Sequence, residues 1–238
     1  MFRKLFLFLI QGKKYSCNIC NSNWRFFNKV GLNSNATKIN TIIGAGLRFT
    51  RCWKCGSVER ERLLMHYIYK IVNPKKLAVL HIAPERVIKK KVENLFLKYI
   101  TGDIEKKEDI EIQVDITNMK VFDDETFDLL ICNHVLEHIT DDANAISEIH
   151  RVLKKNGKAI LNVPIYKNLY STYYNPDIID PNDREFHYGQ FDHVRIYGQD
   201  FFDKVESFGF KKMPINYPSL TNKLKLNPDE FLFQFIKN

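Results

Sequence analysis

The sequence lacks internal repeats, low-complexity tracts and any long hydrophobic run. These absences argue against a fibrous or disordered chain, and against a membrane-spanning helix, which needs about 20 consecutive apolar residues. The 238 residues are 45% hydrophobic, enough for one full α/β domain and a small additional module. We therefore expect a soluble globular protein.

The amino-terminal segment MFRKLFLFLI has the basic residues and short apolar run of a secretory signal, but it lacks a small-residue cleavage site. The run stops at Gln11 and is followed by Lys13 and Lys14. We expect this segment to pack on the domain, with an interfacial membrane anchor as the alternative. The expected protein is cytoplasmic and has no stable membrane insertion.

The formal net charge of +8 is compatible with nucleic acid or another anionic partner. Lysine, asparagine and isoleucine are frequent along the whole chain, as a genome-wide composition bias would produce. Charge alone therefore does not distinguish a nucleic-acid-binding protein from an enzyme that acts on small molecules.

Glycine is absent from KLAVLHIAPERV, the stretch from Lys76 to Val87. The stretch predicts a buried strand followed by a helix, which is where a nucleotide-binding fold usually has a glycine-rich turn. Glycine at that turn lets the backbone approach a bound cofactor closely. The missing glycine leaves two interpretations, a variant cofactor turn or an ordinary core strand.

Four of the five cysteines form two pairs with two residues between the partners: Cys17 with Cys20, and Cys52 with Cys55. A tetrahedral Zn²⁺ ion needs four ligands, and a two-residue spacer directs both thiolates of a pair at one point. The pattern predicts a zinc ribbon with a structural Zn²⁺ ion; unrelated thiol pairs or disulfides are the alternative. Cys132 lies alone in an apolar stretch and is expected to act as a small hydrophobic side chain.

The chain divides into three regions. The polar, glycine-containing stretch between the cysteine pairs predicts short strands and turns around the metal. A helical pattern follows Gly56 and Ser57, and its apolar face is expected to consist of Leu63, Leu64, Tyr67, Ile68 and Ile71. The predicted regions are an amino-terminal segment with the zinc ribbon (1–58), a linking helix (59–75), and a main domain (76–238) with an insert at 165–198.

Apolar runs of strand length alternate with helical patterns through the main domain. This rhythm predicts an α/β fold, Rossmann-like and doubly wound, with a mostly parallel seven-stranded sheet. The expected strands are 77–82, 98–104, 111–116, 127–133, 159–164, 210–216 and 231–237. One expected helix carries Ala143, Ile146, Ile149, Val152 and Leu153 on its apolar face and ends at Asn156-Gly157.

Polar residues follow several of these strands. Ligands of an open parallel sheet bind at the carboxyl ends of the strands, so these positions are the candidate site. An acidic residue after the second strand typically accepts hydrogen bonds from ribose hydroxyls, and Asp103 occupies that position. Asp115 follows the third strand, and Asn133 and His134 follow the fourth. The alternative is that both aspartates only form turns after strands.

The chain from Lys76 to Phe210 resembles a class I S-adenosylmethionine-dependent methyltransferase of the type 11 kind. The similarity is densest in DDETFDLLICNHVLEHITDDANAISEIHRVLKKNGKAILNVP, which follows that family's fourth motif, the next helix and the fifth strand. Together with the paired cysteines, CWKCGSVERERLL, LHIAPE and FDHVRIYG, the chain also resembles a subgroup with an amino-terminal zinc ribbon.

The resemblance implies S-adenosyl-L-methionine as cofactor. By analogy, Asp103 would hold the ribose, Asp115 and Ile116 would flank the adenine, and Asn133 and His134 would lie near the sulfonium. The family's first motif reads acidic-x-Gly-x-Gly, whereas this chain has HIAPE, which we interpret as a variant turn with a small, a stiff and a charged residue. The candidate cofactor-binding residues are His81, Ala83, Pro84, Glu85, Asp103, Ile104, Asp115, Ile116, Asn133 and His134.

The stretch HVLEHI places His134 and His138 one helical turn apart, with Glu137 beside them. This spacing is compatible with a pair of metal ligands. No third ligand has a suitable spacing in the sequence, and the family pattern accounts for the motif. We therefore expect no metal there.

Hydrophobic periodicity fails from Ile165 to Tyr197, a stretch too long for a plain connection. It contains His187, Asp192 and His193, our candidate catalytic residues. Histidine is suited to removing a proton from a hydroxyl or amine near neutral pH. The alternative is that these residues only hold the loop in place by hydrogen bonds.

The leading functional hypothesis is an in-line methyl transfer to oxygen or nitrogen of a small molecule or glycan precursor. The first alternative is an RNA methyltransferase that uses the zinc ribbon and its basic face, where the candidate contacts are Arg48, Arg51, Trp53 and Lys54. The second is a non-catalytic binding protein on the same fold.

Overall fold

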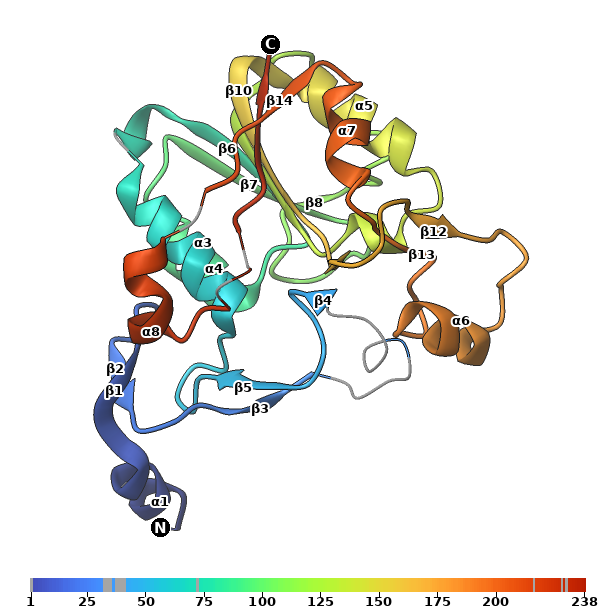
Figure 1. Ribbon diagram of the computed structural model, residues 1–238. Helices are drawn as coiled ribbons and strands as arrows, with labels where there is room; N and C mark the ends of the chain where they lie inside the picture. The colour runs from blue at the N-terminus through green and yellow to red at the C-terminus, as the bar shows by residue number, and fades with distance from the viewer. Residues whose placement is uncertain are drawn as a thin grey trace.

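The structure, a computed structural model, describes residues 2–31, 36, 42–71, 73–215, 217–227, 229 and 231–238. Residues 32–35 and 37–41, which belong to the stretch predicted to form turns and strands between the cysteine pairs, lie outside these ranges. Asn216, at the end of a predicted strand, also lies outside them. Figure 1 shows a sheet flanked by helices, with the amino-terminal region extending from one end.

The centre of the molecule is a seven-stranded sheet of order β14-β15-β10-β9-β6-β7-β8. The pairs from β10 to β8 are parallel, whereas β15 is antiparallel to both β10 and β14. The strands are β6 (Ala78–Ile82), β7 (Lys98–Asp103), β8 (Ile112–Gln113), β9 (Phe127–Asn133), β10 (Leu153–Asn162), β14 (Phe210–Lys212) and β15 (Gln234–Lys237). This confirms the predicted Rossmann-like α/β fold.

Helices cover both faces of the sheet, which explains the continuous apolar strands. All five residues of β6 are buried, and neighbouring residues belong to opposite faces: Val79 packs with one core cluster and Leu80 with the other. The helices on the Val79 face are α3 (Glu59–Lys70) and α4 (Arg86–Val92), and those on the Leu80 face are α5 (Asp142–Val152) and α7 (Phe201–Glu206). Thus α3 covers the sheet as well as linking the two regions.

Helix α5 differs in register and length from the sequence-based expectation. The Asp141 side chain accepts a hydrogen bond from the Asn144 amide, which fixes the start of the helix and places Ala145, not Ala143, in the buried face. The helix ends at Val152, not at Asn156-Gly157, because Leu153 already pairs with Phe127 of β9. Strand pairing therefore overrides the helical pattern at this end.

The cysteine-containing region is built from short elements. They are α1 (Phe2–Ile10), β1 (Gln11–Cys17), β2 (Ser22–Trp24), β3 (Asn28–Val30), β4 (Ile42–Ile43) and β5 (Arg48–Arg51). Strand β1 pairs with β2, and β3 pairs with β5, in both cases antiparallel. We call residues 11–31 and 42–58 the cysteine module.

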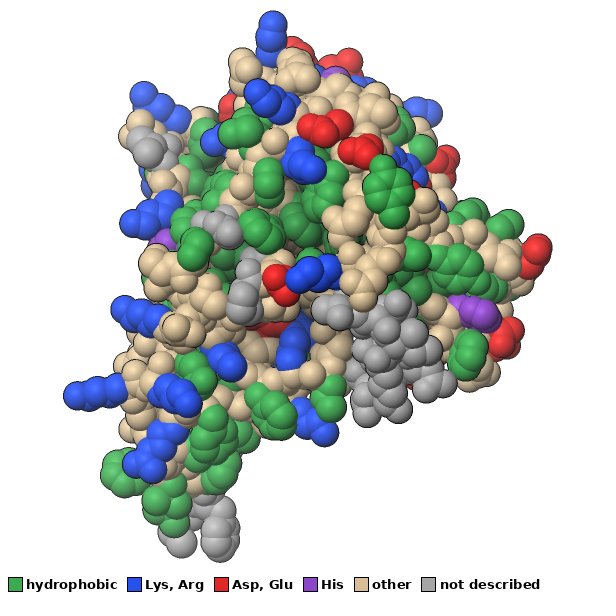
Figure 2. All heavy atoms as spheres, viewed as in Figure 1, with side chains coloured by type: hydrophobic (Ala, Val, Ile, Leu, Met, Phe, Trp, Pro, Cys, Tyr) green, Lys and Arg blue, Asp and Glu red, His purple; other side chains and the backbone are tan. Residues whose placement is uncertain are grey.

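Helix α1 carries exposed hydrophobic side chains. Leu7 and Ile10 pack against the core, as expected for a segment that packs on the domain, but Leu5, Phe8 and Leu9 are 59%, 70% and 59% exposed. Figure 2 shows hydrophobic side chains among lysines and arginines at this lower end of the molecule. Within the described ranges, no helix has the length and apolar character that crossing a membrane requires.

The insert contains regular structure that the sequence did not predict. Its elements are β11 (Ile165–Tyr166), β12 (Tyr173–Tyr174), α6 (Pro181–Tyr188) and β13 (Arg195–Ile196). Strand β11 pairs with β4 of the cysteine module. The insert and the cysteine module therefore meet along one edge of the domain (Figure 1).

Arg62 of α3 joins the cysteine module to the carboxyl-terminal part of the chain. Its side chain is fully buried, and its guanidinium donates to the carbonyls of Leu224, Thr50 and Ser57 at 2.7, 3.0 and 3.0 Å. It also donates to the Thr50 hydroxyl at 2.6 Å and lies 4.3 Å from the centroid of the Phe27 ring. Further short helices within the described ranges are η1 (Pro74–Lys76), η2 (Leu136–His138), η3 (Pro218–Leu220) and α8 (Thr221–Leu224).

Candidate functional site

The strand order reverses between the neighbouring strands β6 and β9, and an open parallel sheet binds its ligands in a crevice outside the carboxyl ends of the strands at such a point. Three predicted cofactor-binding residues form a network there. Glu85 accepts a hydrogen bond from the Asn133 amide at 3.1 Å and pairs with His81 Nε2 at 3.1 Å. Burial would raise the pKa of Glu85, but its contact with His81 holds the pKa below the usual range. A charged carboxylate thus lies at the position expected for the crevice.

The turn after β6 uses alanine where a glycine would be expected. Ala83 has a φ of +45°, in the left-handed region, and its amide donates to the Gly102 carbonyl at 2.7 Å. Pro84 follows, half-buried, and Glu85 precedes α4. The tight turn therefore forms without glycine, at the conformational cost that a side chain adds at positive φ.

This cost leads to a prediction for Ala83→Gly. Glycine relieves the left-handed strain but loses chain entropy on folding, so we expect stability to change by less than about 1 kcal/mol, with either sign. The matched variant Ala78→Gly lies in a regular strand position of β6, where only the entropy and packing losses apply, and should lose about 1 kcal/mol or more. Urea unfolding of both variants measures the difference; equal losses would contradict the strained-turn interpretation.

Asp103 ends β7 and is buried, with 7% exposure. One carboxylate oxygen accepts from the Glu105 amide at 3.0 Å, and the other pairs with the Lys107 ammonium at 2.8 Å. Lys107 is itself half-exposed at the surface. Ile104, the next predicted residue, is exposed. Asp103 is thus held at the sheet edge by groups that a ligand could replace.

The residues predicted to flank the adenine point in different directions. Asp115 is exposed, and its carboxylate accepts hydrogen bonds from the amide and hydroxyl of Thr117, both at 2.8 Å. Ile116 is 4% exposed and belongs to the hydrophobic core. In this structure Asp115 forms a turn, the alternative considered from sequence, and its role toward a cofactor stays a prediction.

A cavity of about 640 Å³ lies where four parts of the chain meet. Its walls come from the cysteine module, the start of α3, the segment after β9, and the insert. His134 and His193 line it, whereas Asp103 and Asp115 do not. Since His134 also follows the cofactor-crevice strand β9, the cavity adjoins the carboxyl edge of the sheet.

Of the six buried polar side-chain atoms that lack a hydrogen-bond partner among the described residues, three lie on residues that line this cavity. These three atoms are Arg60 Nε, Glu137 Oε2 and Arg195 Nε. A fourth, Asn133 Oδ1, belongs to the residue that precedes the cavity-lining His134. Buried polar atoms are nearly always hydrogen-bonded in folded proteins. Their concentration here indicates a place where a ligand supplies the missing partners.

Sequence reasoning did not identify Arg60 and Glu61, which line the cavity from the first turn of α3. Burial, followed by the nearby charge of Glu85, raises the pKa of Glu61 to about 7. A carboxyl that titrates near neutrality can exchange a proton with a bound molecule. The Glu61 side chain also accepts from the Val58 amide at 2.7 Å, a helix-capping pattern that conceals the residue in the sequence.

The three predicted catalytic residues occupy different places. His193 lines the cavity. Asp192 does not orient its neighbour; it contacts His138, whose Nδ1 lies 3.2 Å from the Asp192 carbonyl oxygen and 3.3 Å from its carboxylate. His187 is exposed on α6 and lies 6.3 Å, ring to ring, from Tyr173. The structure therefore brings only His193 into the cavity.

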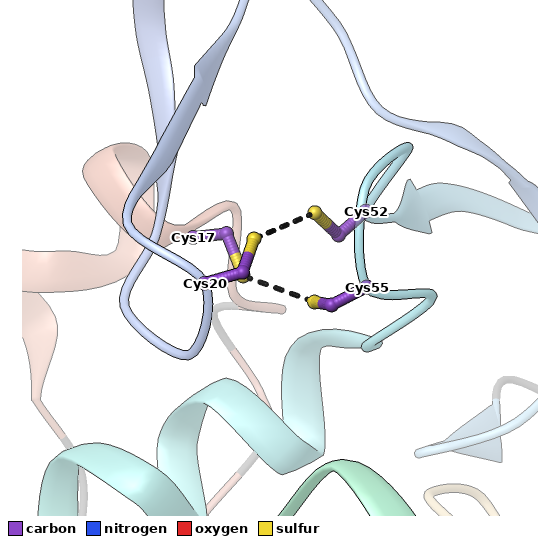
Figure 3. A group of neighbouring side chains, drawn as sticks. All are labelled: Cys17, Cys20, Cys52 and Cys55. Carbon is purple, nitrogen blue, oxygen red and sulfur yellow. Dashed lines mark hydrogen bonds between the residues drawn. The ribbon is translucent and has the colours of Figure 1, made fainter. Parts of the chain in front are cut away.

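The four paired cysteines converge, as Figure 3 shows. Cys17 Sγ lies 3.6 Å from Cys55 Sγ, Cys20 Sγ lies 3.6 Å from Cys52 Sγ, and all four sulfurs fall within 4.8 Å of one another. None is in a disulfide. A tetrahedral zinc site with Zn–S bonds of about 2.3 Å has sulfurs about 3.8 Å apart, so the cluster fits that ion. Hydrogen bonds among the four thiols lower the pKa of Cys17 and Cys52 and raise that of Cys20 and Cys55, so the sulfurs share their protons closely.

Comparisons with known proteins concern the central part of the chain. Residues 72–161 match the family described as methyltransferase domain. Demethylmenaquinone methyltransferase from Alkalihalophilus pseudofirmus is 37% identical over 57 residues, which cover 21% of this chain and 24% of that protein. The chain thus matches about a quarter of the length of this curated relative.

Two solved structures are similar in fold. The [4+2]-cyclase SpnF superimposes with a TM-score of 0.50 at 14% identity, covering 64% of this chain and 58% of that one. A SAM-dependent methyltransferase from Archaeoglobus fulgidus has a TM-score of 0.49 at 14% identity, covering 73% and 91%. The first likeness agrees with the Rossmann-like sheet, and residues 72–161 are similar to the methyltransferase-domain family.

Proposed function

We propose that the chain is an S-adenosylmethionine-dependent methyltransferase acting on a small molecule or glycan precursor. One observation carries the proposal: the stretch that matches the methyltransferase domain spans β6 to β10, and the ends of its strands hold Glu85, Asp103 and Asn133. The crevice between β6 and β9 is where such a sheet binds its ligand. The fold alone would not indicate activity; these side chains at that edge do.

The residues of the crevice fit the cofactor. S-adenosylmethionine, when bound, supplies an electrophilic methyl group and carries ribose hydroxyls and an ammonium. Asp103 is the acceptor for the ribose hydroxyls, after the exposed Lys107 ammonium moves away. Glu85 provides the charge that an ammonium requires, and the unpartnered Asn133 Oδ1 provides a further acceptor. His134 then lies between the crevice and the cavity.

The cavity is the proposed acceptor site. Methyl transfer is an in-line displacement, so the walls must hold the acceptor atom about 3 Å from the methyl group. Arg51 and Arg60 line the cavity and have no carboxylate partner among the ion pairs of the described residues, which favours an acidic acceptor. Glu61 is the candidate for removing the acceptor's proton, because its pKa lies near neutrality.

The cysteine module is proposed to hold one structural Zn²⁺ ion and to form one wall of the cavity. The convergence of four cysteine sulfurs, the usual ligand set of a structural zinc site, supports this role. The RNA alternative gains less support. The Arg48 guanidinium pairs with Glu59, and the Trp53 indole donates to the Phe26 carbonyl at 3.0 Å, so two of the four candidate contacts stabilise the module itself.

Calorimetric titration with S-adenosylmethionine tests the proposal. Wild type should bind, and Asp103→Ala should bind at least about tenfold more weakly, because the buried ribose hydroxyls lose their acceptor. Asp109→Ala is the matched control, since Asp109 is an exposed aspartate of the same β7–β8 connection. It should bind like wild type.

Equal affinity in wild type and Asp103→Ala would remove the ribose assignment. No binding by a folded wild type would remove the enzyme assignment as well and favour the non-catalytic alternative. Binding of RNA that weakens steeply with salt would favour the RNA alternative.

A further inference from the structure

A second group of side chains that could bind a metal ion lines the cavity. Unlike the cysteine cluster, it consists of two imidazoles and a carboxylate. Glu137 and His138 belong to η2, directly after β9, and His193 belongs to the insert. One ligand atom from each falls within 4.8 Å of the others. The rings of His138 and His193 are nearly perpendicular, at 86°, with centroids 4.7 Å apart. All three residues line the cavity.

Neighbouring groups hold two of these ligands in the manner of a metal site. Asp192 engages Nδ1 of His138, at 3.2 Å through its carbonyl and 3.3 Å through its carboxylate, which leaves Nε2 available. His134 Nδ1 engages one oxygen of Glu137 at 3.2 Å. Metal-binding histidines and carboxylates usually have such a second partner, which fixes their orientation.

The other oxygen of Glu137 provides an independent indication. Glu137 is 2% exposed, yet its Oε2 has no hydrogen-bond partner among the described residues. An unpartnered carboxylate oxygen in the interior is costly unless a cation or donor reaches it. The imidazoles of His138 and His193 lie close to this carboxylate, and a cation bound by all three side chains would give the free oxygen an electrostatic partner.

We propose that Glu137, His138 and His193 bind one divalent transition-metal ion, with its open positions toward the cavity. Two imidazoles and one carboxylate are the donor set of three-ligand zinc sites that keep a position for a substrate. Thiolates take no part, so this ion is separate from the one assigned to the four cysteines. This proposal differs from the sequence-based expectation that HVLEHI binds no metal, because the third ligand comes from the insert and not from the same motif.

The ion would define the acceptor. A metal at the cavity wall binds oxygen and lowers the pKa of a coordinated hydroxyl, so the acceptor class is an acidic molecule with a hydroxyl group. This consequence for the substrate rests on the proposed methyltransferase function, whereas the metal site itself does not. The two ideas can therefore be tested separately.

The experiment counts metal. The full chain is equilibrated with buffered free Zn²⁺, desalted and analysed for zinc per chain. We expect His193→Ala and Glu137→Gln each to hold one equivalent fewer than wild type, and Cys52→Ser to lose a different equivalent. The double variant Cys52→Ser with His193→Ala should lose both.

His187→Ala is the matched control, because His187 is an exposed histidine of the same insert and lies outside the cavity. It should keep the wild-type zinc content. Circular dichroism and S-adenosylmethionine binding show whether each variant is folded. Glu137→Gln and His193→Ala lie on different elements, so the test is valid if either variant folds. Wild-type zinc content in folded Glu137→Gln or His193→Ala would overturn the site. Failure of S-adenosylmethionine binding with an intact second zinc would overturn only the methyltransferase function.

Discussion

Replacing Arg62 with methionine will lower the free energy of unfolding by about 3 kcal/mol or more. Methionine keeps much of the buried volume but cannot donate, so the carbonyl oxygens of Leu224 and Thr50 lose the guanidinium donor in the interior, whereas that of Ser57 keeps only the Cys52 amide. For a chain of this size the expected fall in melting temperature is about 6–12 °C. Urea unfolding and calorimetry measure both quantities.

Arg86→Met is the control for this substitution. Arg86 is exposed at the start of α4, and its side chain makes no hydrogen bond or ion pair within the described part of the chain, so its replacement should change stability by less than about 0.5 kcal/mol. A similar small loss for Arg62→Met would mean that Arg62 does not join the module to the domain.

Replacing Cys52 with serine will release the metal of the cysteine module and destabilise the module. A structural zinc ion contributes about 10 kcal/mol in isolated zinc fingers, and a three-thiolate remnant retains little of that energy. Because the module adjoins a large core, we expect a loss of about 3 kcal/mol or more in the whole chain, together with rapid proteolytic cleavage between the two cysteine pairs. Metal analysis and limited proteolysis give the two readouts.

Cys132→Ser is the matched control for the metal. Cys132 is buried in β9 among core residues, so its replacement costs packing but leaves the four-cysteine cluster unchanged. It should retain full zinc content, and chelation of the wild type should reproduce the proteolysis pattern of Cys52→Ser. A metal-free wild type with a protected module would contradict the zinc assignment.

The sheet was predictable because burial on both faces imposes continuous apolar runs, as in AVLHI and FDLLICN. Helix α6 was missed although its boundary signals are present. The Asp180 side chain accepts from the Asn182 amide, Pro181 begins the helix, and Gly189 ends it with a φ of +89°. Only Tyr188 is buried, so the helix lacks the apolar stripe on which the prediction relied.

The candidate site was predictable in parts. Strand ends can be located from the sequence, which is why Asp103 and Asn133 were identified. The approach of His193 to Glu137 and His138 depends on how an irregular insert folds back over the sheet, and sequence spacing contains no such information. Likewise, Glu61 looks like an ordinary capping residue until the burial that raises its pKa is known.

The ion pair between Lys107 and Asp103 should make ligand affinity depend on ionic strength. A ribose that binds the Asp103 carboxylate must displace the Lys107 ammonium, which already pairs with it. The Lys107 side chain is partly exposed to solvent. Dissolved ions screen such an exposed contact, so moderate ionic strength should weaken the competitor more than the neutral sugar. Nucleoside affinity would then rise, rather than fall, as electrolyte is added.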